Sequence, residues 1–95
     1  MDDKSRQDLL QKEVTVTYDE FFETMQLLSA TADSRALKMW EAELREIYKK
    51  VEHLSSFMKQ VNVVQQPKIN LILARPVDQW LVLARAKNKY ILNRM

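Results

Sequence analysis

One run of apolar residues constrains the fold of this chain more than any other feature of its sequence. Apolar side chains recur at alternating spacings of three and four residues from position 37 to position 61. This heptad stripe consists of Leu37, Trp40, Leu44, Ile47, Val51, Leu54, Met58 and Val61. Such spacings place all of its members along one edge of an α-helix, as in helices that pack lengthwise against a partner helix. The pattern therefore predicts a long helix over residues 34–62.

Two large side chains beside the heptad stripe predict more than one neighbour for this helix. With Leu37 as heptad position a, Tyr48 falls at position e and Phe57 at position g. A two-stranded coiled coil normally carries charged residues at these positions. We therefore expect one neighbour to be a helix earlier in the chain, and another to be the last segment or a second copy of the chain.

The chain of 95 residues contains no glycine and no cysteine. Glycine makes up about 7% of an average protein and most easily supplies turns with positive φ and loops that cradle phosphate. Its absence disfavours tight hairpins and phosphate-binding loops, and the absence of cysteine excludes disulfides. This composition predicts one mainly α-helical domain over residues 1–95, with residues 1–13 mobile or weakly helical. We also expect a cytoplasmic protein without a transmembrane segment.

A shorter helix is expected over residues 18–28, antiparallel to the long one. Thr17 stands three residues before Glu20, which is the spacing of a capping box at a helix N-terminus. Residues 29–34 are small or suited to helix caps, and a connection this short usually joins antiparallel helices. The sequence therefore predicts an antiparallel helical hairpin made of residues 18–28 and 34–62.

Two further segments are predicted to be extended. Residues 14–17 are all Val or Thr, and such β-branched side chains favour strands over helix interiors. In residues 68–75, Ile69, Leu71 and Leu73 alternate as they would in a strand, although Pro67 could also open a helix there. We favour the extended conformation, with residues 14–17 as the partner in a minor two-stranded pairing.

A final helix is expected from Pro76 towards Asn93. One of its sides carries Val77, Trp80, Leu81 and Ile91, and the opposite side carries Val82, Leu83, Ala86 and Tyr90. A helix that is apolar on two sides should be buried on two sides. The sequence therefore predicts that the chain associates with a second copy of itself, with another protein, or with both.

Charge is distributed unevenly along the chain. Residues 1–33 carry a net charge of −5 and residues 67–95 carry +5. The bases of the last third are Lys68, Arg75, Arg85, Lys87, Lys89 and Arg94. The four bases of the final helix, Arg85, Lys87, Lys89 and Arg94, flank its apolar side on both edges. Such a placement suits long side chains that cover a buried stripe better than a helix lying along phosphates. The charge pattern therefore favours protein docking over binding of nucleic acid.

The sequence carries no catalytic or metal-binding signature. Its only histidine, His53, is expected to be a solvated helix residue, and its acidic residues form neither an HExxH motif nor an EF-hand loop. We expect a non-enzymatic adaptor or inhibitor without a metal or cofactor, which docks on a larger protein through apolar helix faces. The residues expected to carry binding are the heptad stripe with Tyr48, Phe57, Val77, Trp80, Leu81 and Ile91. The alternative is a small dimeric regulator that binds nucleic acid through the six bases of its last third.

Overall fold

The computed structural model describes residues 3–31, 33–61 and 67–94, and of residues 3, 4, 6 and 87–94 it gives the backbone alone. Four α-helices follow one another in this part of the chain: α1 (Asp3–Ala30), α2 (Ser34–Gln60), α3 (Pro67–Leu73) and α4 (Val77–Arg94). The molecule is a rod that measures 54 × 19 × 19 Å. α1 accounts for most of this length, because a helix of 28 residues spans about 42 Å.

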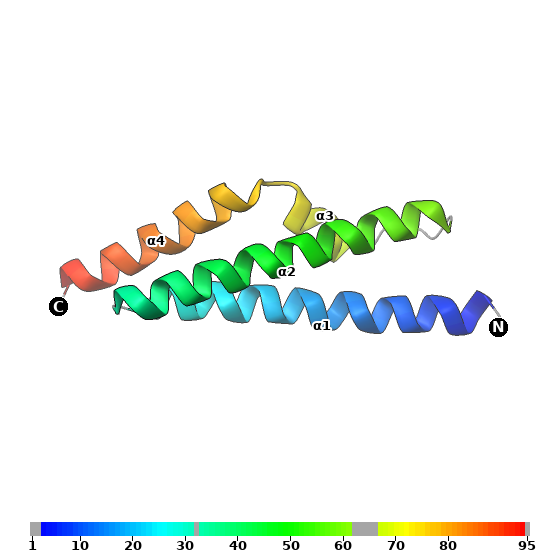
Figure 1. Ribbon diagram of the computed structural model, residues 1–95, viewed down its shortest axis with the longest axis horizontal. Helices are drawn as coiled ribbons and strands as arrows, with labels where there is room; N and C mark the ends of the chain where they lie inside the picture. The colour runs from blue at the N-terminus through cyan, green and yellow to red at the C-terminus, as the bar shows by residue number, and fades with distance from the viewer. Residues whose placement is uncertain (1–2, 32, 62–66, 95) are drawn as a thin grey trace.

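The helices form an elongated bundle with three columns. α1 and α2 lie side by side in opposite directions, and α3 and α4 bring the chain back so that α4 runs in the same direction as α1 (Figure 1). α1 contacts each of the other three helices. The third column is divided between α3 and α4 by a bend at residues 74–76, which includes Pro76. The mainly helical class predicted from the sequence is confirmed.

α1 differs from the prediction, because it begins at Asp3 and runs without a break through residues 14–17. The expectation of an extended stretch there is wrong. Among the described side chains of α1, the buried ones are Leu10, Val14, Thr17, Phe21, Thr24 and Leu28, at spacings of four, three, four, three and four residues. Packing of this face against the other helices outweighs the weak strand preference of the β-branched run. The Thr24 hydroxyl donates to the Glu20 carbonyl oxygen at 2.8 Å, so this polar side chain is satisfied inside the helix.

Residues 67–73 also differ from the prediction, because they form the helix α3. Pro67 occupies the first helical position, where its missing N–H costs no hydrogen bond. Ile69 and Ile72 share one face of α3, and neither has any exposed surface. A helix places Ile69 and Ile72 on one face, so both can be buried in the core. In a strand Ile69 would instead share its face with Leu71, which is 50% exposed, and Ile72 would point to the opposite face. The described residues contain no strand, so the expected pairing with residues 14–17 is wrong as well.

The heptad stripe of α2 faces the interior of the bundle. Leu44, Ile47, Val51 and Met58 are buried, and Leu37, Trp40, Leu54 and Val61 are partly buried against the same core. Asp33 caps the start of α2, where its side chain accepts a hydrogen bond from the Arg35 N–H at 3.1 Å. The neighbours that fill the stripe are α1, α3 and α4 of the same chain.

Candidate protein-docking surface

The candidate site is built on α4, which carries apolar side chains on two opposite sides. Trp80, Leu81 and Ala84 are buried on the inner side of this helix. On the outer side, Val82 is 63% exposed and Leu83 is 38% exposed. The structure therefore covers one apolar side of α4 and leaves the other in contact with solvent.

Trp80 holds the inner side of α4 against the bundle. Its ring meets the rings of Phe21 and Phe22 edge to face, with centroids 5.4 and 5.7 Å apart. Its indole N–H donates to the Ile72 carbonyl oxygen of α3 at 2.9 Å. Trp80 is therefore a core residue that joins three helices, and substituting it would test folding before it tested docking.

Polar contacts with α2 fix the rotation of α4 about its own axis. Arg45 of α2 pairs with Asp78 at 3.1 Å. Arg85 donates from Nε to a Glu41 carboxylate oxygen at 2.8 Å. The Nη2 atom of Arg85 donates a second, shorter hydrogen bond to the same oxygen. Both pairs hold the same flank of α4, so they keep Val82 turned away from the core.

Tyr48 ties α2 to the bend that precedes α4. Its hydroxyl donates to the Arg75 carbonyl oxygen at 2.9 Å. Burial raises the pKa of the Tyr48 hydroxyl above its ordinary value, and the nearby Glu52 carboxylate raises it further. The hydroxyl therefore stays protonated and able to donate this bond to a higher pH than a solvated tyrosine would.

Two shallow grooves continue the outer side of α4. The first lies under the bend and is lined by Ala74, Arg75, Asp78, Gln79, Val82 and Leu83. The second lies between α1 and α4 and is lined by Phe22, Met25, Gln26, Ser29, Ala30, Trp80 and Leu83. They have volumes of about 700 and 530 Å³, and Leu83 lines both of them. We call the residues of both grooves the α4 docking surface.

Most residues predicted to bind a partner lie in the chain's own core or pack against it. Leu44, Ile47, Val51, Met58, Trp80 and Leu81 are buried, whereas Leu37, Trp40, Tyr48, Leu54, Val61 and Val77 are partly buried against them. Phe57 is exposed, and the side chain of Ile91 lies outside the described ones. The wide stripe needs no second chain to cover it, because α1, α3 and α4 all pack around α2.

The described bases of the last third contact three different partners. The Lys68 ammonium lies over the Tyr18 ring at 5.2 Å, and the Arg75 guanidinium lies over the Trp80 ring at 5.5 Å. Arg85 is engaged with Glu41 of α2. The side chains of Lys87, Lys89 and Arg94 lie outside the described ones. Within the described part, the structure does not gather these bases into one stripe.

The sequence already indicated part of this surface. It placed Val82 and Leu83 on a second apolar side of the final helix, yet they were not among the predicted binding residues. Phe22 and Met25 of α1 line a groove with Leu83 only because α1 packs beside α4.

Neither metal-binding groups nor membrane-spanning helices are found among the described residues. Among them, no group of three or more His, Cys, Asp or Glu side chains lies close enough to hold a metal ion. None of the helices, over the residues described, has the length and apolar character needed to cross a bilayer. In comparisons with known proteins, the chain matches no family model, no curated sequence and no solved structure.

Proposed function

We propose that the protein is a non-enzymatic interaction module that docks on a larger protein through the α4 docking surface. The observation that carries this proposal is the 63% exposure of Val82 on a helix whose opposite side buries Trp80, Leu81 and Ala84 in the core. An apolar surface with two hollows suits the apolar side chains of a protein partner. An adaptor or an inhibitor would use such a surface without performing any chemistry.

The rest of the bundle acts as the scaffold for this surface. We propose that α1 and α2 pair as an antiparallel coiled coil, since the buried residues of both helices recur at spacings of three and four. A rigid scaffold reduces the ordering that a partner must impose when it binds. The fixed rotation of α4, held by the ion pairs with α2, supports this role.

The nucleic-acid alternative receives less support from the described residues. Lys68, Arg75 and Arg85 are engaged with two aromatic rings and a carboxylate of the same chain. Phosphate binding by these bases would have to compete with those contacts. The basic last third is better suited to steering the approach of an acidic partner protein, an effect on the association rate that weakens with salt.

The test is affinity capture with the full chain from a nuclease-treated lysate, comparing the parent with Val82→Lys. We expect the variant to keep its circular-dichroism spectrum and lose the captured protein, because a charge would enter an apolar contact. Leu71→Lys serves as the matched control, since Leu71 is 50% exposed on α3 and lies outside both grooves. The proposal would be contradicted if Val82→Lys still captured the protein. It would also be contradicted if the parent captured that protein only from lysate left without nuclease.

A further inference from the structure

α2 carries a second line of side chains, all of them exposed, beside its buried heptad stripe. The members of this second α2 stripe are Met39, Glu43, Glu46, Lys50, His53 and Phe57. Their spacings of four, three, four, three and four residues place them along one edge of the helix. Met39 is 55% exposed and Phe57 is 45% exposed, so two large apolar groups stand in solvent at the two ends of the stripe.

The second α2 stripe is complementary to itself when two copies run in opposite directions. In an antiparallel pair centred on position 48, residues face each other when their numbers add up to 96. Met39 then faces Phe57 of the second copy, which joins the two exposed apolar groups. Glu46 faces Lys50 of the second copy, which joins opposite charges. The two-fold axis repeats each of these contacts.

The same antiparallel pairing also matches the two remaining members of the stripe. Glu43 faces His53 of the second copy, and an imidazole carries at least one ring N–H that can donate to a carboxylate. A parallel pair would instead place each residue opposite its own copy, so that Glu43, Glu46 and Lys50 would each meet a like charge. Charge therefore selects the antiparallel orientation.

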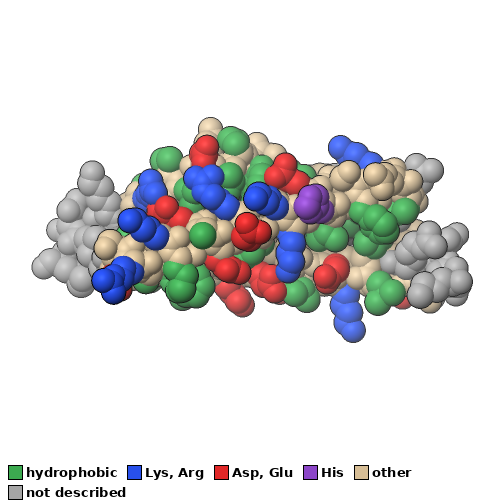
Figure 2. Space-filling model, viewed as in Figure 1, with side chains coloured by type: hydrophobic (Ala, Val, Ile, Leu, Met, Phe, Trp, Pro, Cys, Tyr) green, Lys and Arg blue, Asp and Glu red, His purple; other side chains and the backbone are tan. Residues whose placement is uncertain are grey.

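Exposed apolar residues of α1 extend the surface beside the stripe. The Glu20 carboxylate of α1 lies 3.9 Å from the Lys50 ammonium, so this edge of α1 borders the second α2 stripe. Leu9, Val16 and Leu27 share the face of Glu20, at spacings of seven, four and seven residues, and all three are exposed. In Figure 2, hydrophobic side chains appear along the lower edge of this face, interspersed with acidic and basic side chains.

We propose that the second α2 stripe is a homodimer interface, occupied by the same stripe of a second copy in antiparallel orientation. The Met39–Phe57 contact, made once at each end of the pair, buries apolar area. The Glu46–Lys50 and Glu43–His53 pairs fix the register. The ion pairs that Glu46 and Lys50 make within the chain are long, at 3.7 Å to Lys49 and 3.9 Å to Glu20. Such exposed pairs contribute little, so they leave both side chains available to a second chain. This interface is separate from the α4 docking surface, and its test is independent of the proposed function.

The test uses charge reversal and measures mass by sedimentation equilibrium. We expect the parent chain to reach twice the 11.3 kDa of one chain. E46K alone and K50E alone should each weaken dimerisation by about tenfold or more, because like charges would then face each other at two places. In an equal mixture of the two variants, one stripe is basic and the other acidic at positions 46 and 50. The mixture should therefore dimerise at least as tightly as the parent.

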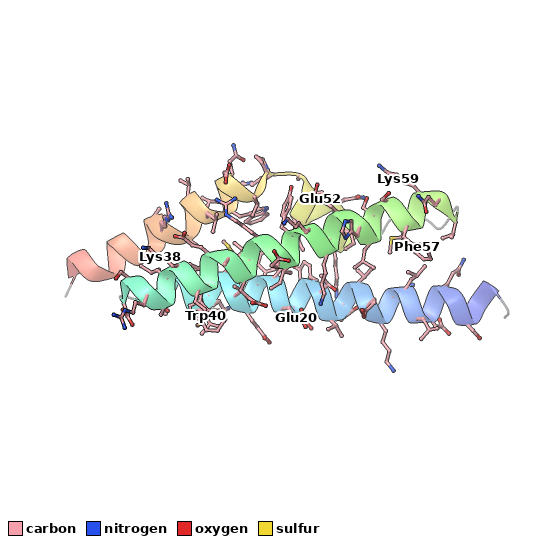
Figure 3. All side chains as sticks on the ribbon, viewed as in Figure 1. Glu20, Lys38, Trp40, Glu52, Phe57 and Lys59 are labelled. Atoms are coloured by element: carbon pink, nitrogen blue, oxygen red, sulfur yellow. The ribbon has the colours of Figure 1, made fainter. Side chains whose placement is uncertain are left out.

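Matched controls lie on the opposite edge of the same helix. Glu52 and Lys59 point away from the edge that carries Phe57 (Figure 3), so E52K and K59E make the same charge changes outside the second α2 stripe. Both controls should dimerise like the parent, alone and mixed. A parent that stays monomeric at millimolar concentration would overturn the proposal. So would E46K and K50E chains that dimerise as the controls do, or a mixture that fails to recover.

Discussion

α4 contacts α1 and α2 in different ways. Against α1 the contact is aromatic and apolar, with Phe21 and Phe22 packed edge to face on Trp80. Against α2 it includes exposed ion pairs, such as Arg45 with Asp78. Burial of apolar area supplies most of the stability of a fold, whereas exposed ion pairs supply little. α1 therefore holds α4 in place, and α2 sets the rotation of α4 about its own axis.

Phe21→Ala should have the largest effect, because it empties the aromatic contact on the α1 side. Phe21 has no exposed surface, and loss of a buried phenylalanine ring costs about 3–5 kcal/mol of unfolding free energy. Urea denaturation followed by circular dichroism would measure this loss. Leu71→Ala on the exposed side of α3 should change the unfolding free energy far less. If the two variants lost similar amounts of unfolding free energy, the contact between Phe21 and Trp80 would contribute little to stability.

Trp80→Phe should have the next largest effect, because it keeps an aromatic ring but removes the N–H that donates to the Ile72 carbonyl oxygen. An unpaired buried carbonyl costs about 1–3 kcal/mol, and the smaller ring adds a loss of packing. The unfolding free energy measured in urea should therefore fall by less than it does for Phe21→Ala. A variant as stable as the parent would show that this bond between α3 and α4 contributes nothing.

Tyr48→Phe probes the α2 side and should cost about 0.5–1.5 kcal/mol, the usual net value of one hydrogen bond. The pKa of Tyr48 is raised in the folded chain, so the protonated hydroxyl favours folding at pH values below the unfolded pKa of about 10. That contribution is lost as the pH rises through the higher folded pKa. Melting temperatures measured from pH 7 to 11 should therefore show the advantage of the parent over Tyr48→Phe shrinking above pH 10. An advantage that stays constant would contradict this account.

Arg85→Ala should have the smallest effect, at most about 1 kcal/mol, because its ion pair with Glu41 lies at the surface. The loss should shrink further in 1 M salt, where the screening length falls to about 3 Å. Melting curves of parent and variant at low and high salt would measure both effects. A loss as large as that of Phe21→Ala would remove the distinction between the two sides of α4.

The two long helices show how far the sequence alone could predict this fold. α2 could be found from its eight apolar residues at heptad spacing, and all of those residues pack in or against the core. α1 buries a stripe of the same spacing, but two of its members are Thr17 and Thr24, and exposed Leu9, Val16 and Leu27 lie along a neighbouring edge of the helix. Its apolar residues therefore marked no single face, and the β-branched run at 14–17 favoured the wrong conformation.

The candidate docking surface was predictable only in part, for a related reason. The sequence indicated two apolar sides on α4, but local periodicity gives both sides the same weight. Trp80 decides which side is buried. Its ring packs on that of Phe21, which lies 59 positions earlier in the chain, and its N–H donates to the Ile72 carbonyl oxygen of the preceding helix. Val82 and Leu83 have no such partners on the described helices and remain at the surface.

The sequence by itself determined that this chain is helical, where α2 lies, and which of its edges faces inward. These properties depend on side chains within a few turns of each other, and spacing alone specifies them. Only the tertiary structure decided that α1 is one continuous helix, that residues 67–73 form α3 rather than a strand, and which side of α4 meets solvent. In each of these cases several apolar faces compete for burial in one small core, and the outcome depends on contacts between residues far apart in the chain.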